Sequence, residues 1–136
     1  MADKGGDRIM ELKNRSQYLD KLISVQDMEV IKVVTGIRRC GKSSLLKLMM
    51  AHLREQGVME EQILSMNFES MQFADMDSKS LYQYVMERAP KEKRLYLFLD
   101  EVQKVRDWQD AVNSFRVDLD CDIYVTGSNA YLLSSE

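Results

Sequence analysis

A stretch of eight residues beginning at Gly36 carries the clearest chemistry in the sequence. It fits the pattern G-x-x-x-x-G-K-[S/T], with Gly36, Gly41, Lys42 and Ser43 at the fixed positions. Glycines let the backbone curl so that consecutive N–H groups surround phosphate oxygens, and the start of a helix adds the positive end of its dipole. Lys42 is expected to reach the β- and γ-phosphates of a nucleotide, and the Ser43 hydroxyl is expected to bind Mg²⁺.

The residues between the two glycines have several open roles. Arg38 and Arg39 either contact the phosphates or face solvent or a neighbouring subunit. Cys40 is either a small spacer or, because helix N-termini favour thiolates, a redox-sensitive thiol. A turn of this kind between a strand and a helix also occurs without a ligand. The residues expected to surround the nucleotide are Gly36, Ile37, Arg38, Arg39, Cys40, Gly41, Lys42, Ser43 and Ser44.

An acidic pair, Asp100 and Glu101, follows the most apolar run of the chain, residues 95–99. If that run is a strand of a parallel sheet, both carboxylates lie at its C-terminal edge, where ligands bind. Asp100 is then placed to hold Mg²⁺ through water, and Glu101 is placed to act as general base toward an attacking water. The alternative is a solvated acidic pair at a strand end.

Polar residues also end the last predicted strand. Thr126, Ser128 and Asn129 follow or close the run at residues 122–126. Such a polar tip is placed to hydrogen-bond the γ-phosphate or the attacking water. The alternative is a simple turn with a helix cap.

Extended and helical patterns alternate along the chain. Apolar runs predict strands at residues 30–35, 63–68, 95–99 and 122–126, the first of them buried. Apolar spacings of three and four predict helices at residues 8–23, 42–56, 78–89 and 107–117. Gly57 is suited to end the second helix, Ser78 to cap the third and Pro90 to stop it. This alternation predicts an α/β protein whose parallel sheet is covered on both faces.

Composition excludes several classes of protein. The chain has 136 residues, which predicts one domain, and its net charge of −3 does not favour nucleic acid as a partner. Two cysteines and one histidine are too few for a disulfide framework, a four-cysteine zinc site or a His-rich metal site. The sequence contains no run of about 18 apolar residues, so it predicts no membrane-spanning helix. We expect a cytoplasmic protein with reduced thiols.

Three segments together resemble the ATPase domain of a prokaryotic AAA-type P-loop family. They are residues 33–44, residues 98–103 with Trp108 downstream, and residues 126–129. The similarity runs from about residue 18 to about residue 133. The box formed by Asp100, Glu101, a hydrophobic residue and Gln103 is more specific to this family than the phosphate loop, which many families share.

The resemblance implies a P-loop NTPase fold, which is a three-layer α/β sandwich with a mainly parallel sheet in the order 2-3-4-1. It also implies ATP (or ADP) and Mg²⁺ as ligands. The site residues that it implies are Lys42, Glu101, Ser128 and Asn129 for catalysis, with Ser128 or Asn129 at a sensor position, and Ser43 and Asp100 for the metal. Gln103 and Trp108 match family positions without an established role, and Trp108 is equally a candidate for the core.

Family members continue past the length of this chain with a fifth strand, a helical subdomain and a C-terminal domain of unknown function. We therefore expect residues 1–24 to be a helical lead-in, and residues 25–136 to be an ATPase core truncated at its C-terminus with the fifth strand missing. The first strand would then have an unpaired edge, which favours self-association or another protein partner.

Four functions remain open from the sequence. The first is Mg²⁺-dependent binding and hydrolysis of ATP, and the second is a nucleotide-dependent switch without significant turnover. The third is a nucleic-acid-associated ATPase in a longer protein, although this segment does not support nucleic acid as a partner. The fourth is a small-molecule kinase. The position of Glu101 beside Asp100 favours water, rather than a small molecule, as the acceptor of the phosphoryl group.

Overall fold

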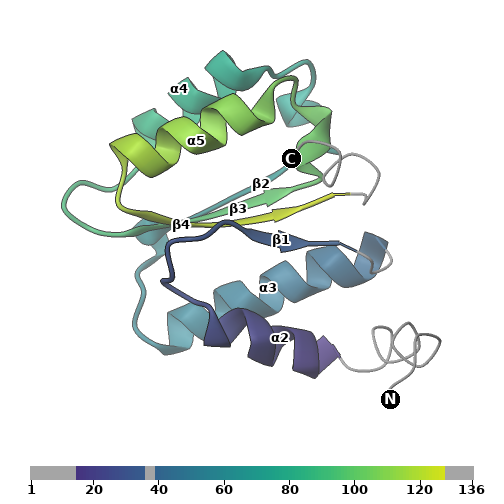
Figure 1. Ribbon diagram of the computed structural model, residues 1–136, viewed down its shortest axis with the longest axis vertical. Coiled ribbons are helices and arrows are strands. Elements are labelled where there is room, and N and C mark those ends of the chain that lie inside the picture. The colour runs from purple at the N-terminus through teal and green to yellow at the C-terminus, as the bar shows by residue number, and fades with distance from the viewer. Residues whose placement is uncertain (1–14, 36–38, 128–136) are drawn as a thin grey trace.

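The computed structural model describes residues 15–35 and 39–127, and Figure 1 shows them as three layers. A four-stranded sheet lies in the middle, with the helices α2 and α3 on one face and α4 and α5 on the other. The elements in chain order are α2 (Arg15–Ser24), β1 (Lys32–Val34), α3 (Arg39–Glu55), β2 (Ile63–Asn67), α4 (Ser78–Arg88), β3 (Leu95–Asp100), α5 (Trp108–Asp118) and β4 (Cys121–Thr126). Three short 3-10 turns, η1 (Glu60–Gln62), η2 (Met71–Phe73) and η3 (Val102–Lys104), lie between them.

All strand pairings among these elements are parallel, and the strand order is β1-β4-β3-β2. Counted from the other edge, this is the expected order 2-3-4-1. The last strand, β4, therefore lies between β1 and β3, with Val33 opposite Val125 and Leu97 opposite Ile123. The predicted α/β fold with its covered parallel sheet is confirmed.

Strand β3 shows why the sequence of a central strand is apolar throughout. Leu97 and Leu99 belong to the core under α4 and α5, whereas Tyr96 and Phe98 belong to the core under α2 and α3. Every residue of β3 is buried, because successive side chains point to opposite faces and both faces are covered. The Phe98 ring stacks on Tyr124 of the neighbouring strand, with centroids 4.7 Å apart.

The described helix boundaries fall within one residue of the expected ones except at the start of α3, and one predicted cap differs. Helix α3 ends at Glu55, and Gly57 follows with φ +98°, so the predicted glycine stop is confirmed. The same helix begins at Arg39, three residues before the expected start at Lys42. The predicted cap at Ser78 is wrong: Ser78 is the first helical residue of α4, and the Asp77 side chain accepts the N–H of Ser80. Of the expected helix at residues 8–23, residues 1–14 lie outside the described part.

The first strand is shorter and more open than predicted. It covers only Lys32–Val34. Val33 points to the opposite face from its two neighbours and is 49% exposed. Within the described residues β1 pairs with β4 alone, so it lies at the edge of the sheet. The β-branched run at residues 30–35 therefore did not indicate a fully buried strand, because edge strands and central strands share the same residue preferences.

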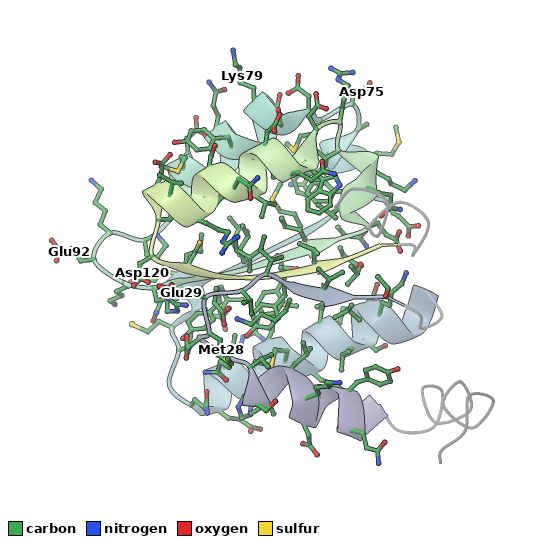
Figure 2. All side chains as sticks on the ribbon, in the orientation of Figure 1. Met28, Glu29, Asp75, Lys79, Glu92 and Asp120 are labelled. Atoms are coloured by element: carbon green, nitrogen blue, oxygen red, sulfur yellow. The ribbon has the colours of Figure 1, made fainter. Side chains whose placement is uncertain are left out.

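A polar network lies at the end of the sheet where the strands begin, near Met28, Glu29 and Asp120 in Figure 2. Lys32 pairs with Asp122, and both side chains are almost completely buried. Asp122 also accepts the backbone N–H of Asp27 at 2.9 Å and the hydroxyl of Tyr124 at 2.7 Å. These bonds tie the segment before β1 to β4. They lie at the opposite end of the sheet from Asp100 and Glu101.

Candidate active site

The site lies where parallel strands end. Asp100 is the last residue of β3 and Thr126 is the last residue of β4. Because β3 and β4 are neighbours, their C-terminal ends meet at one edge of the sheet, and α3 begins at the same edge after β1. The predicted sheet edge thus brings Lys42, Ser43, Asp100 and Glu101 together.

Asp100 is the centre of this group and is only 6% exposed. Its Oδ2 accepts the hydroxyl of Ser43 at 2.5 Å, and its Oδ1 accepts the hydroxyl of Thr126. Hydroxyl and carboxylate oxygens are the ligands that Mg²⁺ prefers, and Mg²⁺ commonly takes one or two protein ligands and fills its octahedron with water and phosphate oxygens. The adjacent Ser43 and Asp100 oxygens fit such an ion. No larger acidic or histidine cluster that could hold a metal occurs among the described residues.

Lys42 is a buried cation, 6% exposed, in the first turns of α3. Its Nζ donates to the carbonyl oxygen of Gly127 at 2.9 Å and lies 3.9 Å from Oε2 of Glu101. A buried ammonium needs such partners because burial removes its water shell. The side chain is therefore held across the end of β4, toward the acidic pair.

Glu101 adopts the left-handed backbone region, with φ 59° and ψ 49°. This conformation costs a non-glycine residue about 1–2 kcal/mol, and such strain is concentrated at functional sites. It turns the chain sharply after β3, and the N–H of Glu101 donates to the Thr126 hydroxyl oxygen at 2.9 Å. Glu101 is only 7% exposed, and its carboxylate lies between the ammonium of Lys42 and the side-chain amide of Gln103.

Thr126 is a site residue that the sequence does not assign to catalysis, nucleotide binding or the metal. It is fully buried, and its one hydroxyl contacts both members of the acidic pair. The signal for it was present, since Thr126 closes the strand that the resemblance places beside β3. The sequence places Thr126 in the polar tip together with Ser128 and Asn129, but the catalytic assignment names only Ser128 and Asn129, which lie outside the described residues.

The remaining predicted residues divide into two groups. Gly41, Lys42, Ser43 and Ser44 lie in α3, where Arg39 and Cys40 begin the helix. Gly36, Ile37 and Arg38 lie outside the described residues. Trp108 begins α5 and packs against the core under α4 and α5, as the core alternative predicted. Gln103, in η3, contacts Glu101 instead.

Cys121 differs from a reactive thiol. It is half-buried at the start of β4, and burial raises the pKa of its thiol to about 11. A thiol with such a pKa stays protonated at neutral pH and is a poor nucleophile or metal ligand.

Every helix in the described part of the chain is too short or too polar to span a membrane.

Comparison with known proteins agrees with this geometry. A family model described as an AAA domain matches residues 29–136. An uncharacterized protein of Haemophilus influenzae is 42% identical over 125 residues, which is 90% of this chain and 31% of that protein. An uncharacterized protein of Methanocaldococcus jannaschii is 26% identical over 129 residues, or 93% of this chain and 28% of that protein. No solved structure matches the chain significantly.

The chain thus spans about a third of the length of these relatives. Most of its residues, including the sheet and every described site residue, fall within the matched AAA domain. The AAA domain is a nucleotide-binding module, and the cluster of Lys42, Ser43 and Asp100 at the end of the parallel sheet agrees with that role. The chain belongs to the AAA domain family.

Proposed function

We propose that this chain binds ATP with Mg²⁺ and hydrolyses the terminal phosphoanhydride bond. The observation that supports this most is the arrangement around Asp100. The Ser43 hydroxyl bonds one oxygen of Asp100, while the neighbouring Glu101 faces the Lys42 ammonium. A cation, a pair of hard oxygen ligands and a separate carboxylate are the parts that phosphoryl transfer to water requires.

Each residue has a role in this proposal. Lys42 leaves the carbonyl of Gly127 and binds the β- and γ-phosphates. Ser43 and Asp100 hold Mg²⁺, which neutralises charge on the phosphates when it is bound. Glu101 accepts the proton of the attacking water as general base. The other proposed contacts to nucleotide are Gly36, Ile37, Arg38, Arg39, Cys40, Gly41 and Ser44, with Ser128 and Asn129 near the γ-phosphate.

The two carboxylates are suited to different work because their partners differ. Both oxygens of Asp100 accept hydroxyl groups, and one of these comes from the proposed metal ligand Ser43. Glu101 accepts an amide N–H on one oxygen, and its other oxygen lies near the ammonium of Lys42. Once Lys42 binds phosphate, that second oxygen is free to accept a proton from water.

Binding and hydrolysis are tested separately. Calorimetry with Mg-ATP should show binding to the wild type that Lys42→Ala abolishes, while Lys47→Ala, an exposed lysine of the same helix, leaves it unchanged. Glu101→Gln should keep the affinity and lower the rate of phosphate release by about 10²–10⁴-fold, the usual contribution of a general base. A wild type that does not bind ATP or ADP at millimolar concentration contradicts the proposal.

A nucleotide-dependent switch is the second candidate. It is favoured by the share of the relatives that this chain covers, about a third, because charge-stabilising groups outside the chain can be worth 10³–10⁵ in rate. Phosphate release separates the two functions: tight binding with no release from the wild type would support the switch. Association with nucleic acid, with another protein or with a second copy of this chain is also a proposal. So is the division into a lead-in at residues 1–24 and an ATPase core at residues 25–136.

A further inference from the structure

Gln103 lies beside the proposed general base. It belongs to the turn η3, two residues after Glu101, and its Nε2 donates to Oε1 of Glu101 at 2.8 Å. The turn is fixed on both sides of Gln103, because Val102 and Val105 are buried in the core under α4 and α5. The backbone of the turn is therefore held by its neighbours, and the amide is held by its hydrogen bond to Glu101.

The orientation of the Gln103 amide follows from chemistry. An ionised carboxylate only accepts hydrogen bonds, so the NH₂ end of the amide must face Glu101 and the oxygen must point elsewhere. That oxygen, Oε1, is buried and has no hydrogen-bond partner among the residues that the structure describes. A buried acceptor without a donor is costly, and such groups are rare unless a water, an ion or a function accounts for them.

We infer that Gln103 takes part in the hydrolysis proposed above by holding the attacking water together with Glu101. The inference rests on that proposed function. A water molecule has two hydrogens to donate, and two acceptors lie side by side here, the Glu101 carboxylate and Oε1 of the Gln103 amide that is hydrogen-bonded to it. With both hydrogens engaged, an oxygen lone pair of the water is turned toward the phosphorus.

The step then balances without a further reactant. The water oxygen forms a bond to the γ-phosphorus while the bond from that phosphorus to the bridging oxygen breaks. One proton of the water moves to Glu101, and the other stays on the oxygen that becomes part of inorganic phosphate. A neutral amide cannot compete for the proton, so Gln103 orients the water and Glu101 alone acts as the base.

Gln103→Met tests the inference because it keeps the length of the side chain and removes both polar atoms. We expect Mg-ATP affinity within twofold of the wild type, with kcat lowered by about a hundredfold and KM unchanged, the scale expected when a reacting group is misplaced. Lys104→Met is the matched control, since Lys104 is an exposed residue of the same turn, and it should leave both constants unchanged.

A spectroscopic measurement checks the contact independently of turnover. The side-chain NH₂ signals of Gln103, assigned by their loss in Gln103→Met, should lie apart from those of solvent-exposed glutamines. Glu101→Ala should move them toward the exposed position, because the carboxylate partner is gone. If the signals do not move, the contact on which the inference stands is absent.

The outcomes separate this inference from the proposed function. Gln103→Met that binds and hydrolyses Mg-ATP like the wild type overturns the inference alone. A wild type that fails to bind Mg-ATP, or binds it without releasing phosphate, contradicts the proposed hydrolysis and the inference with it. Should Gln103→Met not fold, Gln103→Asn, whose amide is one methylene shorter, gives the same test and the same expected loss of rate.

Discussion

The hydroxyl oxygen of Thr126 lies 2.9 Å from the backbone nitrogen of Glu101, and the same hydroxyl donates to the carboxylate of Asp100. One side chain at the end of β4 thus fixes both acidic residues that follow β3. The proposed metal ligand and the proposed base cannot shift relative to each other without breaking one of these bonds. This relationship makes Thr126 the first residue to test.

Thr126→Val should damage stability and binding together. Valine fills the same volume but leaves the Glu101 N–H and one oxygen of Asp100 without their partner in a buried place, which costs about 1–3 kcal/mol. We expect that loss in urea unfolding, with weaker Mg²⁺-dependent nucleotide binding by calorimetry. Thr126→Ser keeps the hydroxyl and is the control. Equal stability of the valine and serine variants would contradict the role given to this hydroxyl.

Breaking the buried pair of Lys32 and Asp122 should destabilise the protein more than replacing both of its members. Lys32→Met leaves the carboxylate of Asp122, a residue only 1% exposed, without its charge partner, and we expect a loss of about 3–5 kcal/mol in the free energy of unfolding. The double variant Lys32→Met, Asp122→Leu should recover part of this loss, since no buried charge remains. A double-mutant cycle from chemical denaturation measures the coupling, and strictly additive losses would refute it.

Acid should weaken the segment before β1 through Asp27. Partial burial alone would raise the pKa of this carboxyl, but hydrogen bonds from Tyr96 and Gln26 and the charge of Arg94 outweigh it and hold the pKa below its ordinary value of 3.8. The contribution to stability is therefore complete above the unfolded pKa and is lost as pH falls below about 4. Because the side chain is 44% exposed, we expect less than about 1 kcal/mol.

Stability measured between pH 3 and pH 6 checks this expectation. Asp27→Asn keeps the size of the side chain and removes its titration, so its stability should vary less with pH than that of the wild type over this range. Asp20→Asn, on the exposed face of α2, is the control, and its profile should match the wild type. Identical profiles for Asp27→Asn and the wild type would show that Asp27 makes no such contribution.

Alkali should act through Tyr96. Burial, followed by the hydrogen bond to Asp27, raises the pKa of Tyr96 to about 12. A folded pKa above the unfolded value of about 10 means that the stabilisation is complete below pH 10 and is lost as pH rises through 12. Tyr96→Phe has no phenol to ionise, so it should lose less stability than the wild type between pH 10 and pH 12. The lost hydrogen bond to Asp27 should also make it less stable than the wild type at neutral pH. Fluorescence-monitored denaturation over this range gives both values.

The start of α4 offers a paired test of the corrected cap. Asp77→Ala removes the side chain that accepts the N–H of Ser80, so it should lower the melting temperature by a few degrees. Ser78→Ala changes only the first helical residue and should leave it nearly unchanged. Calorimetric melting of the two variants decides between the caps, and a larger loss from Ser78→Ala would restore the sequence prediction.

Much of the fold could be predicted because its signals are local and strong. The apolar residues 95–99 sit in a central strand covered on both faces, and Gly57 follows α3 in the conformation that favours glycine. The exposure of Val33 could not be predicted in this way. It depends on which neighbour covers β1, and the residue preferences of a strand do not carry that information.

The site was predictable as far as residue types and spacing determine it. Lys42, Ser43, Asp100 and Glu101 follow from patterns with a known chemistry, and the structure brings them to one edge. The double contact of Thr126 and the amide of Gln103 depend instead on the left-handed turn at Glu101. Few non-glycine residues adopt that backbone region, and the sequence around Glu101 holds no signal for it.

The position of β4 has a consequence for how the protein is made. Among the described strands β4 is the last to leave the ribosome, yet it fills the gap between β1 and β3. Strand β1 pairs only with β4 among the described strands, so it has no partner strand until β4 has been made. The sheet of the described residues, and with it the edge that carries Asp100 and Thr126, is therefore complete only after β4 has been made.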